Sequence, residues 1–100
     1  MATKEDQIRS VLQNIGKLSG VESVVLADEN GFPLSSTITT RSAETISALI
    51  TSLKGRISLV LKELDLDEVQ TVTLKTPTRE IIVTPYNSST LVVIRKVNSD

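Results

Sequence analysis

The sequence predicts one domain of the α/β class, α+β type, with the element order α-β-β-α-β-β-β. Three features of the chain carry this prediction: a long helix with two apolar faces, an Asn-Gly turn between two strand-like segments, and three C-terminal strand segments. The links between those last strands are too short for a crossover helix, so they must pair antiparallel. The 100 residues fit one small domain, expected over residues 1–100.

The first element is an amphipathic helix, expected over residues 4–18. Its apolar positions recur every three or four residues and form one narrow face: Ile8, Val11, Leu12, Ile15 and Leu18. Thr3, with Asp6 three residues later, is the expected N-terminal cap. Gly16 and Gly20 favour termination of the helix near its predicted end.

A β-hairpin is expected next, with strands over residues 21–27 and 32–37. The segment Asp28-Glu29-Asn30-Gly31 between them is a strong turn signal. Gly31 can adopt a positive φ angle in such a turn at no steric cost.

The long helix is expected over residues 43–64, with Ser42 as its cap and Glu44 near the positive end of the helix dipole. One continuous apolar stripe should face the domain's own sheet: Ile46, Leu49, Ile50, Leu53, Ile57, Val60, Leu61 and Leu64. The opposite side is small and flat: Ala48, Ser52, Gly55 and Leu59. A side that faced only water would more often carry Lys and Glu, and glycine inside a helix costs about 1 kcal/mol relative to alanine. We therefore expect that side to contact a second protein chain; the alternative is an ordinary surface of small residues.

Three strands complete the chain, expected over residues 69–75, 80–84 and 90–97, with a turn over residues 85–89 between the last two. Unbroken apolar runs in the last two strands, and in the strand before the hairpin turn, indicate strands covered on both faces by one helix each. The segment 70–75 instead alternates, which is typical of an edge strand buried on one face. Such an edge needs a partner or protection, and Lys75 could provide the protection. The positions expected to pair with a second chain are Gln70, Val72 and Leu74.

The composition excludes several classes of function. The chain has no cysteine and no histidine, which removes disulfides, thiolate sites, the commonest general base and the commonest zinc ligand. With a net charge of −1 and two aromatic residues, nothing indicates binding to nucleic acid or to an anionic membrane. The acidic connectors lack the pattern of a calcium loop. No segment is typical of a signal peptide or a membrane span, so we expect a cytoplasmic protein. Because the residue types of common catalytic and metal sites are missing, we also expect that it is not an enzyme and holds no metal or cofactor.

The order and spacing of these segments resemble the Roadblock/dynein-light-chain family, which includes the MglB-type bacterial polarity proteins. The resemblance covers residues 8–97 and is carried by Gly20-Val21, the hairpin over residues 25–34, the Ala/Ser/Leu-rich long helix, and the runs 80–85 and 91–94. It implies a five-stranded antiparallel sheet between helices in a profilin-like layout. It also implies a homodimer, or a heterodimer with a related chain, in which the long helices pack antiparallel and the edge strands join. The sequence ends soon after the last predicted strand, so we expect no partner contacts from a C-terminal extension.

The resemblance implies a regulatory or scaffold protein that binds a small Ras-like GTPase and modulates its activity or localisation. Two alternatives stay open: a structural light chain that binds a subunit of a dynein-like motor complex, and a small-molecule sensor domain. Candidate contacts to such a partner are Arg41, Arg56 and Lys62, which flank the proposed dimer helix. Arg56 could act as an arginine finger. The alternative for all three is a solvated helix flank.

Overall fold

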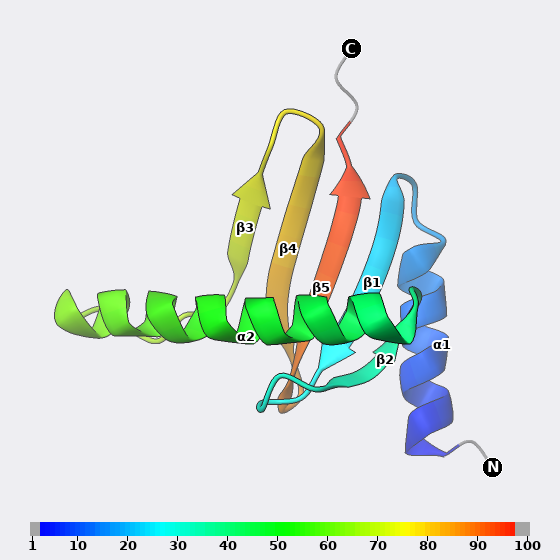
Figure 1. The fold of residues 1–100 in the computed structure, drawn as a ribbon, viewed down its shortest axis with the longest axis horizontal. Helices are drawn as coiled ribbons and strands as arrows, with labels where there is room; N and C mark the ends of the chain where they lie inside the picture. Colours follow the sequence, from blue (N-terminus) through cyan, green and yellow to red (C-terminus); the bar gives the residue numbers. More distant parts are fainter. Residues whose placement is uncertain (1–2, 98–100) are drawn as a thin grey trace.

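The chain forms a five-stranded antiparallel sheet crossed on one face by a long helix and covered on the other by a short one (Figure 1). The computed structural model describes residues 3–97, so residues 1–2 and 98–100 of the expected domain lie outside the described residues. The elements are α1 Lys4–Gly16, β1 Val21–Ala27, β2 Pro33–Ser36, α2 Thr40–Glu63, β3 Val72–Lys75, β4 Arg79–Tyr86 and β5 Ser89–Lys96. The strand order is β2-β1-β5-β4-β3. The predicted fold class and element order are confirmed.

The core is built on both faces of β1. Val24 and Leu26 pack with Leu12 of α1, whereas Val25 between them packs with Ala43 of α2. All five side chains are at most 2% exposed. Successive strand residues point to opposite faces, so an unbroken apolar run is what a strand between two helices requires.

α1 begins at its predicted cap and ends earlier than predicted. The Thr3 hydroxyl accepts a hydrogen bond from the Asp6 N–H (3.1 Å), and the Asp6 carboxylate accepts one from the Thr3 N–H (3.2 Å). These hydrogen bonds lower the pKa of Asp6. The last turn tightens, because the Leu18 N–H donates to the carbonyl of Ile15. Leu18 therefore lies beyond the helix and is 62% exposed, which makes its predicted place on the buried face wrong.

The turn between β1 and β2 forms at the predicted residues. Asp28 Oδ1 accepts hydrogen bonds from the N–H groups of Asn30 and Phe32, both at 2.9 Å. Gly31 has φ +88°, and a β-carbon built there would lie 3.2 Å from Thr51 Oγ1 of α2. The turn therefore needs glycine both for its backbone angle and for its close approach to α2.

α2 begins three residues earlier than predicted. Thr39, not Ser42, is the N-cap: its backbone is extended and its hydroxyl accepts a hydrogen bond from the Ser42 N–H. Because the first turn now starts at Thr40, it contains no acidic residue, and the predicted place of Glu44 in that turn was wrong.

The face of α2 that lies on the sheet is narrower than predicted. Its centre holds the small side chains of Ala43 and Ser47, and only Ile46 and Ile50 of the predicted apolar stripe pack on the α2-side core cluster. Leu49 lies roughly 160° around the helix from the buried Ser47, so it points away from the sheet although it belongs to the predicted stripe. Three members of the stripe are instead 65, 57 and 62% exposed: Leu49, Val60 and Leu64.

Ser47→Ala is expected to raise the free energy of unfolding by about 1 kcal/mol. The Ser47 side chain is fully buried under α2, and its Oγ has no hydrogen-bond partner among the described residues. A buried hydroxyl without a partner costs free energy, and alanine is the better helix former. Urea unfolding of the two proteins measures the difference. A loss of stability in the variant would show that the hydroxyl is satisfied in solution.

β3 lies at the edge of the sheet, as predicted, but is shorter than predicted. The register pairs Val72 with Val83, which places Gln70 opposite Pro85. A proline has no N–H to donate, so the ladder cannot extend back to Gln70. The predicted strand start was wrong for this reason, and Gln70 lies in the connector before β3.

β4 runs through Pro85 to Tyr86, past the start of the predicted turn, and Tyr86 pairs with Ser89. Pro85 is tolerated inside the strand because its nitrogen faces the side where β3 has not yet begun. The turn over residues 85–89 predicted from the sequence therefore shrinks to Asn87 and Ser88.

A charged ladder crosses the sheet on the α1 side. The Glu80 carboxylate accepts a hydrogen bond from Arg95 Nε at 2.7 Å and lies 3.7 Å from Lys75 Nζ. The hydrogen bond from Arg95, with the charges of Arg95 and Lys75, lowers the pKa of Glu80 below its ordinary value despite partial burial. Above the ordinary pKa this carboxylate therefore stabilises the fold.

The ladder predicts a loss of stability in acid. Because the pKa of Glu80 is lower in the folded than in the unfolded chain, its contribution is present above the unfolded value and lost as pH falls through the folded value. We expect Glu80→Gln to flatten the decline in unfolding free energy between about pH 6 and about pH 3. The part of this acid-induced decline that is due to Asp6, whose pKa is also lowered, should remain in the variant. Identical pH profiles for the two proteins in urea unfolding would contradict this role.

Candidate protein-interaction surface

Apolar side chains that the single chain leaves in water gather on α2, on the connector after it and at β3. We name this set the α2–β3 surface; its members are 39 to 65% exposed and are Leu49, Leu59, Val60, Leu64, Leu66 and Leu74. Figure 1 shows that the C-terminal end of α2 extends past β3, so the helix end overhangs the sheet edge. Exposed apolar side chains beside an open sheet edge are typical of a contact with another protein.

The small side of α2 predicted from the sequence is also exposed. Ala48, Ser52, Gly55 and Leu59 are all accessible to solvent. A β-carbon built on Gly55 meets no atom within 4 Å, so packing inside the described chain does not require glycine there. Glycine inside a helix costs stability relative to alanine, and no contact within the single chain explains why this position has a glycine.

The outer edge of β3 has no strand beside it among residues 3–97. Val72 is half-buried in the α2-side core cluster, and Leu74 on the same face is 39% exposed. The open edge therefore carries one half-buried and one exposed apolar side chain on the face that α2 crosses. Of the three edge positions predicted to pair, Gln70 is the one that the structure places outside the strand.

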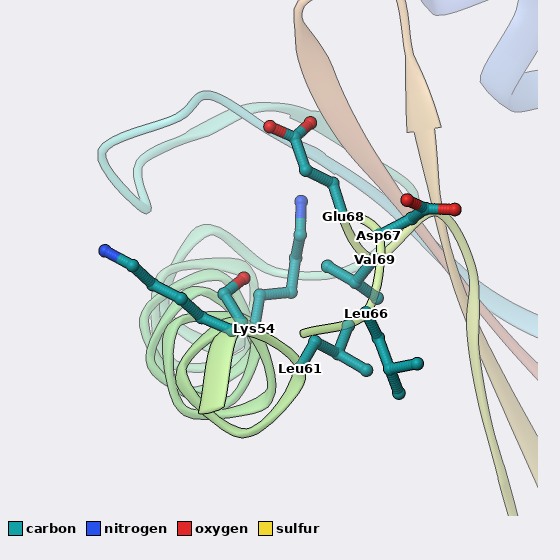
Figure 2. Close-up of a pocket in the computed structure, with 8 residues that line it drawn as sticks. Lys54, Leu61, Leu66, Asp67, Glu68 and Val69 are labelled. Atoms are coloured by element: carbon teal, nitrogen blue, oxygen red, sulfur yellow. The ribbon is translucent and has the colours of Figure 1, made fainter. Parts of the chain in front are cut away.

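A groove of about 560 Å³ lies between the C-terminal half of α2 and the connector to β3 (Figure 2). Leu61, Leu66 and Val69 supply its apolar lining, and Asp67 and Glu68 add carboxylates at the connector. A second depression of about 430 Å³, bounded by the β1–β2 and β4–β5 turns, meets it at two shared residues, Lys54 and Ser58.

Lys54 is a residue of this groove that the sequence analysis missed. Its Nζ donates a hydrogen bond to Thr90 Oγ1 of β5 at 2.9 Å, so the lysine bridges α2 and the sheet. The available signal was spacing: Lys54 falls near the same line of the helix as Ala43 and Ser47, which face the sheet.

The three candidate partner contacts are exposed but do not form one cluster. Arg41 lies in the first turn of α2 and Lys62 in its last, which separates them by roughly 30 Å along the helix. Arg56 lies roughly 180° around the helix from the buried Ser47 and so points away from the sheet. Lys62 lines the groove. Within one chain they cannot contact a small ligand together.

The described residues include no group of three or more side chains suited to hold a metal ion. Among the same residues, neither helix is long and apolar enough to cross a membrane.

Comparisons with known proteins give the same fold. A family model described as the Roadblock/LC7 domain matches residues 8–95. The solved structure of Myxococcus xanthus MglB is similar with a TM-score of 0.83 and 20% identity, covering 96% of this chain and 74% of that one. A Roadblock/LC7 domain from Streptomyces avermitilis gives 0.76 and 20%, covering 91% and 77%. A structure described as MglB with tetrameric arrangement gives 0.79 and 16%, covering 96% and 76%. No curated protein sequence matches the chain significantly.

Proposed function

Because the chain belongs to the Roadblock/LC7 domain family, we propose that it is a non-enzymatic regulatory or scaffold protein that acts as a dimer and binds a small Ras-like GTPase. The observation that carries the proposal is the α2–β3 surface, where exposed apolar side chains lie beside an open strand edge. Binding would bias the conformation of the GTPase or its location.

The dimer uses the exposed side of α2 and the edge of β3. On α2 the contact is made by Ala48, Ser52, Gly55 and Leu59; on β3 it is made by Val72 and Leu74, with Gln70 beside them in the connector. Small side chains let two helices approach closely, and an open edge accepts a second strand. One two-fold axis can satisfy both contacts. The tetrameric arrangement described for an MglB structure supports self-association as a property of such domains.

The dimer would also bring the basic residues together. In an antiparallel pair of α2 helices, Arg41 of one copy lies at the end where Lys62 of the other copy lies. Arg56, which points away from its own sheet, is then accessible on the paired helices. This platform would supply cations from both copies to a complementary acidic surface of a bound GTPase.

A pull-down from lysate of the source cells tests the GTPase proposal. Tagged protein is incubated with excess non-hydrolysable GTP analogue or with GDP, and captured proteins are identified by mass spectrometry. A Ras-like GTPase enriched in one nucleotide state supports the proposal. A motor or scaffold subunit captured equally in both states would replace it with the light-chain function. No protein partner, but a thermal shift with a small molecule, would point to a sensor domain.

Arg56→Ala is expected to weaken capture of the GTPase by roughly tenfold, since a desolvated charged contact contributes on the order of 1 to 3 kcal/mol. Arg9→Ala is the matched control, because Arg9 is also an exposed arginine on a helix but lies on α1. Both variants should keep the dimer mass. Normal GTPase binding by Arg56→Ala would remove Arg56 from the proposed contact.

A further inference from the structure

Two depressions form one continuous groove along the C-terminal half of α2. The larger, of about 560 Å³, lies against the connector between α2 and β3, and the smaller, of about 430 Å³, lies against the β1–β2 and β4–β5 turns. Lys54 and Ser58 line both, so the two depressions meet there. We name the pair the joined groove. Gly55, which lines the smaller depression, also belongs to the α2 contact proposed for the dimer, so the groove runs beside that contact.

Carboxylates lie at both ends of the joined groove. Asp28 and Glu29 lie at one end, in the β1–β2 turn. Asp67 and Glu68 lie at the other end, where Figure 2 shows both side chains projecting from the connector. Among residues 3–97, no lysine or arginine forms an ion pair with any of these four carboxylates. Each end therefore keeps negative charge that the single chain does not neutralise.

The lysines of the joined groove offset this charge only in part. Lys54 is held by the domain itself, because its Nζ donates a hydrogen bond to Thr90 Oγ1 of β5 at 2.9 Å. It lies where the two depressions meet, away from both acidic ends. Lys62 is exposed and lines only the larger depression. Because four carboxylates outnumber two ammonium groups, the occupant of complementary charge is cationic.

The walls between the two ends differ in polarity. The smaller depression is lined by hydroxyl groups, among them those of Ser88 and Ser89. The larger depression has an apolar lining of Leu61, Leu66 and Val69. An occupant that passes from the turns to the connector therefore meets hydroxyl groups first and apolar side chains next.

The length of the groove sets the spacing of its acidic ends. On α2 the lining runs from Thr51 to Lys62, which is roughly 16 Å along the helix axis. An extended segment rises about 3.3 Å per residue, so about five residues cover this distance. A single small cation occupies one end only, whereas an extended segment of this length reaches both.

We propose that the joined groove binds an extended basic segment of a partner protein, with one basic side chain at each acidic end and an apolar side chain against Leu61. The two basic side chains are about five residues apart in the partner, and the apolar one lies next to the basic side chain that meets Glu68. This inference goes beyond the proposed function, because it requires neither the two-fold dimer nor the basic residues assigned to the GTPase contact.

Titration of the isotopically labelled protein with two synthetic peptides, followed by NMR, tests the proposal. The first peptide is acetyl-Arg-Ser-Gly-Ser-Leu-Arg-amide, and the second has the same composition with its two arginines adjacent. We expect the first peptide to shift the amide resonances of Glu29 and Glu68 with one common saturation curve. It should bind roughly fivefold more tightly than the second, because only the first can form ion pairs at both ends.

Three variants separate binding in the groove from general attraction between charges. Glu29→Gln and Glu68→Gln each remove one charge at one end, and each should weaken binding of the first peptide roughly threefold to fivefold. Glu44→Gln is the matched control, because it makes the same change at an exposed position of α2 outside the groove, and it should leave binding unchanged. Circular dichroism verifies that each variant is folded.

The outcomes separate the groove from the proposed dimer. Shifts at both ends, with a loss in both groove variants and none in the control, support the proposal. Overturning results are the absence of a saturable shift at millimolar peptide, shifts at one end only, equal binding of the two peptides, and equal losses in all three variants. Sedimentation of the same samples reports the mass: a monomer that still binds the first peptide overturns the dimer alone, and a dimer that does not bind it overturns the groove alone.

Discussion

Leu59→Arg is expected to convert the protein from a dimer into a monomer without unfolding it. The side chain is 65% exposed in the single chain, so it contributes little to the core, whereas the proposed α2 contact removes it from water in both copies. Full burial of a leucine contributes about 1.5 to 3 kcal/mol, and the two-fold axis applies the loss twice. The dissociation constant should therefore rise roughly a hundredfold or more. Sedimentation equilibrium over a range of concentrations measures it.

Leu18→Arg is the matched control for this experiment. Leu18 is 62% exposed, nearly the same as Leu59, but it lies in the α1–β1 connection. Its replacement should leave the dimer mass unchanged. Gly55→Arg should behave like Leu59→Arg, because the built β-carbon meets no neighbour and arginine is the better helix former. If Leu59→Arg keeps a dimeric mass at all concentrations, the α2 contact is wrong.

Gly31→Ala is expected to lower the free energy of unfolding by about 2 kcal/mol or more. The backbone at Gly31 has φ +88°, and a positive φ costs a residue with a β-carbon roughly 1 to 2 kcal/mol. The new β-carbon would also lie 3.2 Å from Thr51 Oγ1 and 3.3 Å from Thr51 Cβ, so the turn or α2 must shift. Urea unfolding measures the loss, best in a Leu59→Arg background where association does not contribute.

Gly55→Ala in the same background is the opposite case. Gly55 lies in a helix with open space around it, so alanine should raise the free energy of unfolding by up to about 1 kcal/mol.

Adding Thr51→Ala to Gly31→Ala should recover the part of the lost stability that is due to the close contact and leave the part that is due to the backbone angle. A Gly31→Ala protein as stable as the wild type would show that the turn does not need the positive φ.

Features that depend on neighbours in the chain were predictable. The Thr3 cap, the Asn30-Gly31 turn and the buried run Val24-Val25-Leu26 all follow from spacing and local backbone preference. The structure confirms each of them. The position of β3 at the edge of the sheet was also predictable, because the alternation of polar and apolar residues over 70–75 indicates a strand that is buried on one face only.

The cap of α2 was missed although it is also local. Thr39 and Ser42 both carry hydroxyls suited to cap a helix, and the sequence offers no reason to prefer the earlier one. In the structure Thr39 has extended backbone angles and Thr40 is already helical, so the earlier hydroxyl caps the helix.

By itself the sequence determined the types and order of the elements, the turn at Gly31 and the presence of an exposed small side on α2, because periodicity and turn chemistry are properties of short segments. Only the tertiary structure decided which side of α2 lies on the sheet, since helical spacing gives relative angles but not the direction of the core. That orientation leaves Leu49, Val60 and Leu64 in water. The start of β3 likewise depends on a register that sets Gln70 opposite Pro85, a contact between distant residues that no local pattern records.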